Sequence, residues 1–380
     1  MSKPVSGQDH KTECRRDMSR EMIYLCSCAV NGVTAEKARV EQMDLYALYQ
    51  TAEDHMLTAI VAYSLAAAGV RNPAFIWAKE RAARKTALMD AEQAKIVEKL
   101  ESAGIRYMPM KGAVLKDLYP ANCIREMSDR DILIDADRVK DVRNIMLGLG
   151  FSTERFDKDY HDCYTKPPAC NFEMHRHLIG PMSGKTIYSY YLDEERLLQK
   201  DSGNAYGYHL RAEDFYVFLV AHEYKHFIAE GIGLRSLLDI FVYLKTIEPD
   251  MNYIRAEVKK LGIEDYEQAN RSLAMHLFGN GTLTDAEQIT LDYMLSSGAH
   301  GKEENITMNT LEREGKKGFF LSRLTLPYDR MLEIYPILKK APVLYPFCWL
   351  HRLVHAMIHK KEKVIAQLRA GLTWKENKRI

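Results

Sequence analysis

Two aspartates separated by a single residue, Asp129 and Asp131, begin a short stretch that turns apolar and ends at Ile134. The pattern predicts a strand, and side chains two residues apart on a strand project from the same face, roughly 7 Å apart. Carboxylates held this close repel each other unless a cation lies between them. Hard oxygen ligands select Mg²⁺ or Mn²⁺, and Mg²⁺ held by one or two carboxylates usually completes its coordination with water and substrate phosphates. The pair therefore indicates a metal site that binds a nucleoside triphosphate.

The residues before this strand favour a phosphate site over a solvated pair of aspartates at a strand entrance. An apolar run from Tyr107 ends in Lys111 and Gly112, which predicts a short strand closed by a turn. Backbone N–H groups at such a glycine turn can approach phosphate oxygens. Arg125 lies four residues before Asp129 and could neutralise phosphate charge.

A later segment, residues 171–178, alternates polar and apolar side chains and predicts another strand. Glu173, His175 and His177 fall on one of its faces. If this strand lies beside the strand of the aspartate pair, Glu173 supplies a third carboxylate. Otherwise Glu173 is an exposed strand residue. His175 is more typical of a positioning or structural histidine than of a base.

These motifs resemble a bacterial family of uncharacterised nucleotidyltransferases within the polymerase-beta-like nucleotidyltransferase superfamily. The similarity extends over about residues 60–360 and is most specific in four segments: Met110-Lys-Gly112, Leu118-Tyr-Pro120, Arg125-x-Met-Ser-Asp129-x-Asp131-Ile-Leu-Ile134 and Asn171-Phe-Glu-Met-His175. The resemblance implies an enzyme with Mg²⁺ or Mn²⁺ as cofactor and a nucleoside triphosphate as substrate.

The resemblance also assigns residues. Asp129, Asp131 and Glu173 would hold the metal, and Glu173 could also accept the proton of the attacking hydroxyl group. The expected nucleotide-binding residues are Lys111, Gly112, Arg125, Ser128 and Lys225.

Two positions depart from the superfamily pattern. Its members usually have a serine after the glycine turn, whereas Ala113 follows Gly112 here, so a hydroxyl contact to phosphate is missing. The residue between the aspartates is usually apolar, but Arg130 occupies that position. We therefore expect the strand face of Arg130 to be less buried than usual.

A second motif competes with this interpretation. The helix expected over residues 212–228 contains His222-Glu223-x-x-His226, which matches the zinc-protease pattern. Histidines four residues apart share a helix face and can bind one Zn²⁺, with the glutamate as base. The extended form of the motif is absent, because Ala229 stands where it has glycine. A zinc metalloprotease is therefore the weaker alternative.

The family resemblance gives the same helix another role. Members commonly carry a lysine here, followed by an arginine and an aspartate, which correspond to Lys225, Arg235 and Asp239. Lys225 would approach the triphosphate. Arg235 and Asp239 are four residues apart on the helix expected over 234–246, and they could equally form a surface ion pair.

Charge and cysteine content limit the partners and the compartment. The 380 residues include 53 Lys and Arg and 52 Asp and Glu, for a net charge of +1. No basic stripe with interleaved aromatic residues appears, so a long nucleic acid is not the expected acceptor. Seven cysteines without metal-finger spacing favour a reducing cytoplasm. The polar first residues are not expected to form a secretory signal, and no apolar run reaches the about 18 residues that a membrane span needs, so no transmembrane segment is expected.

The sequence as a whole predicts an α+β protein, with a small mixed β-sheet nucleotidyltransferase core flanked by N- and C-terminal helical regions. The expected division is a helical lead-in over 1–103, the core over 104–200 and a helical region over 201–380. The expected reaction moves a nucleoside monophosphate to a hydroxyl group of a small-molecule or protein acceptor. The departures at Ala113 and Arg130 leave open a non-catalytic nucleotide-binding or interaction protein.

Overall fold

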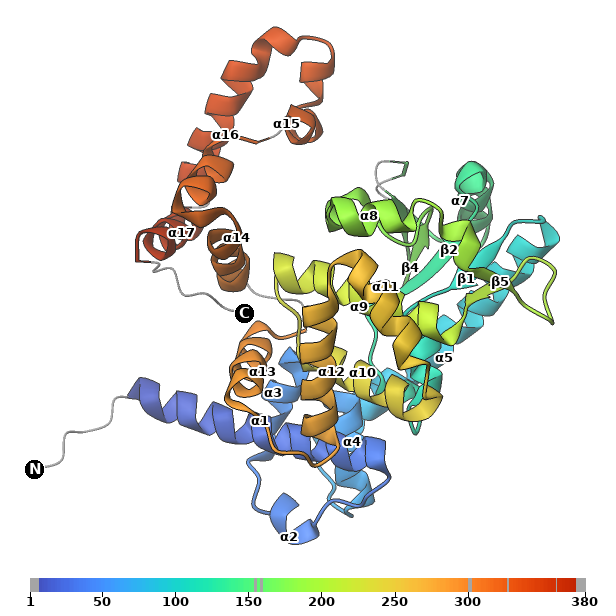
Figure 1. Cartoon of the computed structure of the whole chain (residues 1–380), viewed down its shortest axis with the longest axis vertical. Helices are drawn as coiled ribbons and strands as arrows, with labels where there is room; N and C mark the ends of the chain where they lie inside the picture. Colours follow the sequence, from blue (N-terminus) through green and yellow to red (C-terminus); the bar gives the residue numbers. More distant parts are fainter. Residues whose placement is uncertain are drawn as a thin grey trace, which may run out of the picture. The chain divides into compact units, whose positions relative to one another are not determined.

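The computed structural model of the chain (Figure 1) describes residues 7–153, 156–157, 160–299, 303–326, 328–359 and 361–373. These residues form two compact units. The first unit comprises Met1–Lys225 and Ile232–Ala299, and the second comprises His226–Gly231 and His300–Ile380.

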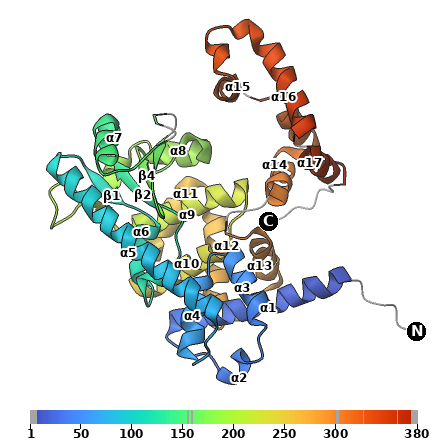
Figure 2. The ribbon, with the colours of Figure 1, turned by 180° about the vertical axis from the view of Figure 1, so that it is seen from behind.

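Unit 1 begins with helices. Their bounds are α1 (Gly7–Asn31), α2 (Lys37–Val40), α3 (Leu45–Asp54), α4 (Thr58–Ala67) and α5 (Pro73–Ser102). The start of α5 follows from local chemistry, because the Asn72 side chain accepts hydrogen bonds from the N–H groups of Ala74 and Phe75, and Pro73 is the first helical residue. Figure 2 shows the length of α5, which runs from α4 to the sheet.

The sheet of unit 1 has four strands in the order β1-β2-β4-β3. Their bounds are β1 (Tyr107–Pro109), β2 (Arg130–Ile134), β3 (His161–Lys166) and β4 (Cys170–His175). β2 and β4 are parallel, whereas β1 is antiparallel to β2 and β3 is antiparallel to β4. This small mixed sheet with helices on either side in the sequence confirms the predicted α+β class.

One face of the sheet is covered by α5 and by α7 (Val139–Gly148). The buried core between them is almost wholly apolar and includes Met89, Ile96, Leu100, Ile132, Ile134, Val142, Met146, Phe172 and Met174. Helix α7 and β3 both lie between the parallel strands β2 and β4 in the chain, within the long crossover connection that parallel strands require.

Arg130 corrects one prediction. Arg130 is 0% exposed, although we expected an arginine at this position to make its face of the strand less buried than usual. The guanidinium lies 2.7 Å from Asp90 and donates to the Gln93 side-chain oxygen at 3.0 Å, both on α5. A buried arginine is tolerated here because an acidic partner on the covering helix offsets its desolvation.

The remaining elements of unit 1 follow the sheet in the sequence. They are α6 (Gly112–Leu115), α8 (Lys185–Tyr191), β5 (Leu198–Lys200), β6 (Tyr208–Leu210), α9 (Ala212–Ala229), α10 (Leu234–Ile247), α11 (Met251–Leu261), α12 (Glu264–Phe278) and α13 (Asp285–Ser297). Helix α9 continues into the second unit. Helix α10 packs against α12, and α12 packs against α1, so the N-terminal helices and the helices after the sheet share one core.

Unit 2 is helical. Its helices are α14 (Glu303–Leu324), α15 (Tyr328–Ile334), α16 (Tyr345–His359) and α17 (Lys361–Thr373). Helix α14 is interrupted at Gly315, where the backbone has φ 66°, and α14 packs against α17. Within the described part of the chain, every helix is too short or too polar to cross a lipid bilayer.

Candidate active site

The uncovered face of the sheet carries a polar cluster, which we call the acidic cluster: Asp129, Asp131 and Glu173. Asp131 on β2 is paired in register with Glu173 on β4, and Glu173 is paired with Cys163 on β3. Paired residues on adjacent strands project from the same face. The structure therefore brings Asp131 and Glu173 side by side, which the sequence could predict only if these two strands were neighbours.

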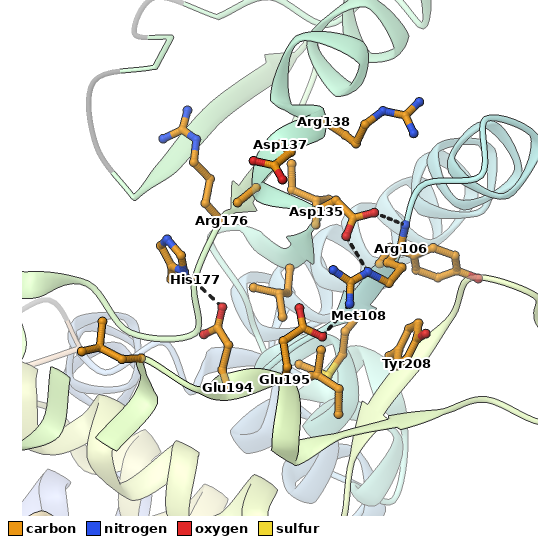
Figure 3. Close-up of a pocket in the computed structure, with 16 residues that line it drawn as sticks. Arg106, Met108, Asp135, Asp137, Arg138, Arg176, His177, Glu194, Glu195 and Tyr208 are labelled. Carbon is orange, nitrogen blue, oxygen red and sulfur yellow. Dashed lines mark hydrogen bonds and ion pairs between the residues drawn. The ribbon is translucent and has the colours of Figure 1, made fainter. Parts of the chain in front are cut away.

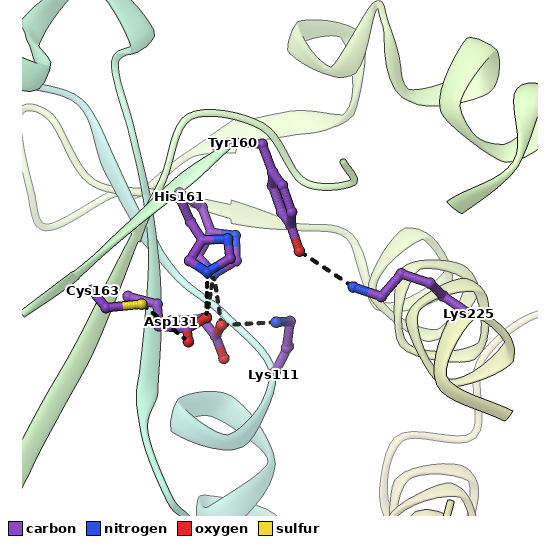
Figure 4. A network of polar contacts seen from close by, with 8 residues as sticks. Lys111, Asp131, Tyr160, His161, Cys163 and Lys225 are labelled. Atoms are coloured by element: carbon purple, nitrogen blue, oxygen red, sulfur yellow. Dashed lines mark hydrogen bonds and ion pairs between the residues drawn. The ribbon is translucent and has the colours of Figure 1, made fainter. Parts of the chain in front are cut away.

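Asp131 is the buried member of the cluster, with 7% of its surface exposed. One carboxylate oxygen lies 2.7 Å from the ammonium of Lys111 and 2.7 Å from Nε2 of His175 (Figure 4). Burial alone would raise the pKa of Asp131, but the Lys111 charge and the contacts with His175 outweigh it and lower the pKa below its usual range. Asp131 is therefore an anion at neutral pH.

Asp129 lies one residue before β2 and is half-buried. Burial, followed by the charges of Asp131 and Glu173, raises its pKa above the ordinary value. Its carboxylate makes no hydrogen bond or ion pair with any other described residue. Asp129 is thus held beside two other acids without a bonded cation of its own, and a divalent ion would relieve that repulsion.

Glu173 joins the cluster to two histidines. Its Oε2 lies 3.3 Å from Nε2 of His175 and 3.7 Å from Nε2 of His161. Burial acts to raise the pKa of Glu173, but the hydrogen bond with His175 and the charge of His161 leave it below the ordinary value. Glu173 is therefore ionised at neutral pH and can accept a proton or bind a cation.

Basic groups approach the cluster from separate elements. Lys111 lies in the turn between β1 and α6, and Lys225 extends from α9 toward the same region, where its ammonium donates to the Tyr160 hydroxyl at 3.2 Å (Figure 4). Lys85 on α5 donates to the carbonyl oxygens of Met127, at 2.6 Å, and Ser128, at 3.2 Å. Lys85 thereby fixes the segment that leads into Asp129.

The Lys111 backbone is unusual. It has φ 47° and ψ −116°, a conformation that favours glycine. Such strain costs of order 1–3 kcal/mol and persists only where the surrounding structure imposes it. Here the conformation directs the Lys111 side chain onto Asp131.

Arg125 has a partner that its place in the sequence does not indicate. Its Nε and Nη2 each lie 2.7 Å from one carboxylate oxygen of Asp239 on α10, and both residues are buried. The Tyr119 hydroxyl donates to the same carboxylate at 2.7 Å. Two nitrogens of Arg125 are therefore already engaged, and its expected phosphate contact stays a prediction.

The burial of Asp239 also decides an alternative raised from the sequence. A surface ion pair between Arg235 and Asp239 is wrong, since Asp239 is 3% exposed.

Gly112 lies directly against this pair. A Cβ atom at Gly112 would come within 2.5 Å of Arg125 Nη1 and 2.7 Å of Met127 Sδ. Only glycine fits the turn while Arg125 occupies its present place. The side chain of Ser128 approaches Met56, with its hydroxyl 3.7 Å from the sulfur.

Arg235 is a further basic residue near the acidic cluster. It donates to the Glu126 carbonyl oxygen at 2.9 Å, and its charge is among those that oppose the raised pKa of Asp129. Burial lowers the pKa of Arg235 from the ordinary arginine value. The family resemblance indicated Arg235 without saying what it contacts, and the structure shows its contact with the Glu126 carbonyl oxygen.

The zinc-protease motif does not assemble a metal site. Glu223 is buried, and burial and the charge of nearby Asp239 raise its pKa well above the ordinary value, which disfavours the carboxylate that a catalytic base needs. His226 pairs with Glu230 at 2.8 Å. Among the described residues, the groups whose ligand atoms converge are Asp131–Glu173–His175 and His161–Cys163–Glu173. Neither group includes His222 or His226.

A cavity of about 470 Å³ lies at the carboxyl ends of β2 and β4 (Figure 3). Its charged groups pair with one another, since Arg106 contacts Asp135 and Glu195, both at 2.5 Å, and His177 contacts Glu194 at 3.1 Å. This cavity therefore offers little unpaired positive charge for a triphosphate. The basic groups at the amino end of β2 are the better match.

Two residues beside the acidic cluster, His161 and Cys163, were not foreseen from the sequence. They are two residues apart on β3, which a short turn joins to β4. That spacing was available as a signal, but the strand has no clear apolar alternation to reveal it.

Comparison with known proteins gives one match. No curated protein and no solved structure matches the chain. A family model described as "uncharacterised nucleotidyltransferase" matches residues 41–279, which is more than half of the chain and includes the whole four-stranded sheet and the acidic cluster. The chain therefore belongs to this nucleotidyltransferase family and is an enzyme of that kind.

Proposed function

We propose that the protein transfers a nucleoside monophosphate from a nucleoside triphosphate to a hydroxyl group of a small-molecule or protein acceptor, with Mg²⁺ or Mn²⁺ as cofactor. The observation that carries this proposal is the pairing of Asp131 with Glu173 on adjacent parallel strands, with Asp129 beside them. The same three positions support a place in the polymerase-beta-like superfamily.

The donor set fits a hard divalent ion. Three carboxylates supply oxygen ligands, and Asp129 has its carboxylate uncommitted among the described residues. Asp129, Asp131 and Glu173 would hold the ion, and the remaining positions would be filled by water and phosphate oxygens. When bound, the metal would supply charge neutralisation for the triphosphate and for the leaving pyrophosphate.

The protein's own residues would do the rest. Glu173, ionised at neutral pH, would accept the proton of the acceptor hydroxyl while His175 keeps it oriented. The acceptor oxygen would bond to the α-phosphorus as the bond to pyrophosphate breaks. Lys111 and Lys225 would approach the phosphates, and the Gly112 backbone and Ser128 would line the turn beside them. Arg125 would position the turn through its pair with Asp239.

The charge balance supports a small-molecule or protein acceptor over a long nucleic acid, because the net charge is only +1. The cysteines whose side chains the structure describes are all free. Free thiols suit a reducing compartment, and we infer that the enzyme acts in the cytoplasm.

The test measures nucleotide binding by calorimetry with and without Mg²⁺, for the parent and for Asp131→Ala. We expect the parent to bind nucleotide only with Mg²⁺, and Asp131→Ala to weaken that affinity at least about tenfold. A loss of this size follows from removing a buried contact to a charged group. Asp137→Ala is the matched control, since Asp137 follows the same strand but is exposed. If neither Mg²⁺ nor Asp131 affects binding, the proposal fails.

Turnover is tested separately. Incubation of α-labelled nucleotides with candidate acceptors, the protein itself included, should release pyrophosphate and label the acceptor. Tight Mg²⁺-dependent binding without any transfer would favour the non-catalytic nucleotide-binding alternative.

A further inference from the structure

We propose that His161, Cys163 and Glu173 form a second metal site, which takes a soft divalent ion such as Zn²⁺. This site, the β3 site, lies next to the acidic cluster and shares Glu173 with it. It goes beyond the proposed nucleotidyl transfer, which needs neither His161 nor Cys163.

The strand register creates the β3 site. Cys163 on β3 is paired directly with Glu173 on β4, and His161 is paired with His175. His161 and Cys163 are two residues apart, so both project from the uncovered face of the sheet. The ligand atoms of His161, Cys163 and Glu173 all lie within 4.8 Å of one another.

The distances match those around a tetrahedral ion. Cys163 Sγ lies 3.7 Å from Glu173 Oε1, and His161 Nε2 lies 3.7 Å from Glu173 Oε2. A tetrahedral Zn²⁺, with bonds of about 2.0 Å to nitrogen and oxygen and about 2.3 Å to sulfur, separates its ligand atoms by roughly 3.3–3.6 Å. Both of these separations lie within a few tenths of an ångström of the tetrahedral values, and the third, between Cys163 and His161, is at most 4.8 Å.

The surroundings hold the ligands in place. The rings of His161 and His175 are stacked, with centroids 5.0 Å apart, and Tyr160 packs edge-on against both rings. His161 and Glu173 retain 20% and 21% side-chain exposure. An ion can thus reach the site from solvent, while the ring of His161 is held in place by His175 and Tyr160.

The ligand types select the ion. Thiolate and imidazole bind Zn²⁺ and Co²⁺, whereas Mg²⁺ prefers oxygen ligands alone. On binding, the Cys163 thiol releases its proton to solvent and the sulfur becomes a thiolate ligand. Three protein ligands leave a fourth position for water, as in zinc sites that are not purely structural.

Glu173 is the shared residue. A Zn²⁺ ion in the β3 site withdraws one carboxylate from the acidic cluster. Zinc should therefore weaken Mg²⁺-dependent nucleotide binding in the parent protein, and this effect should vanish when Cys163 is replaced.

The test uses Co²⁺ as a probe on the full-length, metal-stripped protein. Co²⁺ bound by a thiolate gives a charge-transfer absorption band in the near ultraviolet, and added Zn²⁺ should abolish it by displacement. We expect the thiolate band of the parent to saturate at one equivalent of bound Co²⁺. Cys163→Ala should lose the band, and His161→Gln should weaken binding of both ions by at least about tenfold.

Two controls separate this site from its neighbours. Cys170→Ala removes a buried cysteine on β4 that faces the core, so the band should remain. Asp129→Asn should keep the band while it loses Mg²⁺-dependent nucleotide binding, so failure of the β3 site and failure of the proposed function give different results.

The inference is overturned if the parent binds no Co²⁺, or if the band survives in Cys163→Ala. Thermal unfolding of each variant shows whether it is folded. If Cys163→Ala does not fold, Cys163→Ser decides instead, since a hydroxyl preserves the side-chain size and still abolishes the thiolate band.

Discussion

Lys111 combines a strained backbone with a charged contact, and the two can be separated. Lys111→Gly and Lys111→Ala both remove the ammonium from Asp131, but only glycine adopts φ 47° without strain. We expect Lys111→Gly to be more stable than Lys111→Ala by about 1–2 kcal/mol in urea unfolding. Lys95, within α5, is the matched control. There glycine should be the less stable of the two by about 1 kcal/mol.

We expect the Asp129 carboxylate to lower the stability of the metal-free protein and to be needed for nucleotide binding. Its carboxylate is desolvated and repelled by Asp131 and Glu173, so Asp129→Asn should raise the unfolding free energy of the metal-free protein by on the order of 1 kcal/mol. The same change should abolish Mg²⁺-dependent nucleotide binding. Asp137→Asn, at an exposed carboxylate, should change neither quantity. A metal-free Asp129→Asn protein that unfolds more easily than the parent would contradict this account.

The sequence predicted some of these residues and missed others for physical reasons. The alternation around Glu173 and the Asp129–Asp131 spacing are local, so the strand faces could be inferred from them. Arg125 was assigned to phosphate because nothing local shows that Asp239, 114 residues away, takes its guanidinium. Residue type alone does not reveal such a distant partner.

At the scale of elements, the start of α13 carries a titratable cap. Thr284 and Glu287 form a reciprocal capping box, and Glu287 also accepts from Ser272 at 2.8 Å and contacts His276 at 2.9 Å. Burial acts to raise the pKa of Glu287, but the hydrogen bonds from Thr284, Ser272 and His276 outweigh it and lower the pKa from 4.5 to about 2.

A lowered carboxyl pKa stabilises the fold above the pKa of the unfolded chain. The contribution of Glu287 should be complete above about pH 5 and should be lost as the pH falls toward about 2. Glu287→Gln should therefore be less stable than the parent at neutral pH, and the gap in unfolding free energy should narrow as the pH falls. Asp292→Asn, on the exposed side of α13, should keep a constant difference. Urea unfolding across this range measures both.

The Arg125–Asp239 pair ties the segment before β2 to α10. Because both groups are buried, Asp239→Asn leaves an uncompensated buried charge and should cost about 3–5 kcal/mol in urea unfolding. Asp141→Asn breaks the exposed pair of Arg138 and Asp141 within residues 136–148 and should cost less than about 1 kcal/mol. A similar small cost for both would show that Asp239 behaves as a surface residue.

Element prediction succeeded where periodicity was strong. The helices expected over 212–228 and 234–246 correspond to α9 (Ala212–Ala229) and α10 (Leu234–Ile247) within two residues. β3 was not assigned its bounds, because His161, Asp162 and Cys163 lack an apolar alternation. The burial of Arg130 was also missed, since it depends on Asp90 in a helix that lies across the sheet.

At the scale of the whole molecule, ligand binding should raise the free energy of unfolding. A ligand at about 100 times its Kd raises the unfolding free energy of the form that binds it by about 2.7 kcal/mol. We therefore expect Mg²⁺ with a nucleoside triphosphate to raise the Tm of unit 1, which holds every residue of the acidic cluster. The nucleotide with a chelator, or Mg²⁺·nucleotide with Asp131→Ala, should leave Tm nearly unchanged. An equal shift in that variant would place the ligand elsewhere.

The sequence indicated the layout of the whole chain only partly. Near residue 103 the chain changes from α5 to β1, and hydrophobic periodicity reveals that change, whereas residue 200 ends β5 and the paired strand β6 follows it. The expected division into 1–103, 104–200 and 201–380 stays a prediction. The compact units divide around residues 226–231 and 300, and α10, α12 and α1 share a core that no local sequence pattern indicates. Which helices pack together depends on contacts between segments far apart in the chain.

Glu173 stands where two chemically different sets of side chains meet. One carboxylate cannot serve both sets fully, so occupancy of one centre comes at the expense of the other. The relative supply of trace zinc and abundant magnesium would then decide how much of the protein is ready to bind nucleotide. Preparations that differ only in their exposure to chelators should differ in activity, and the difference should disappear once Cys163 is replaced.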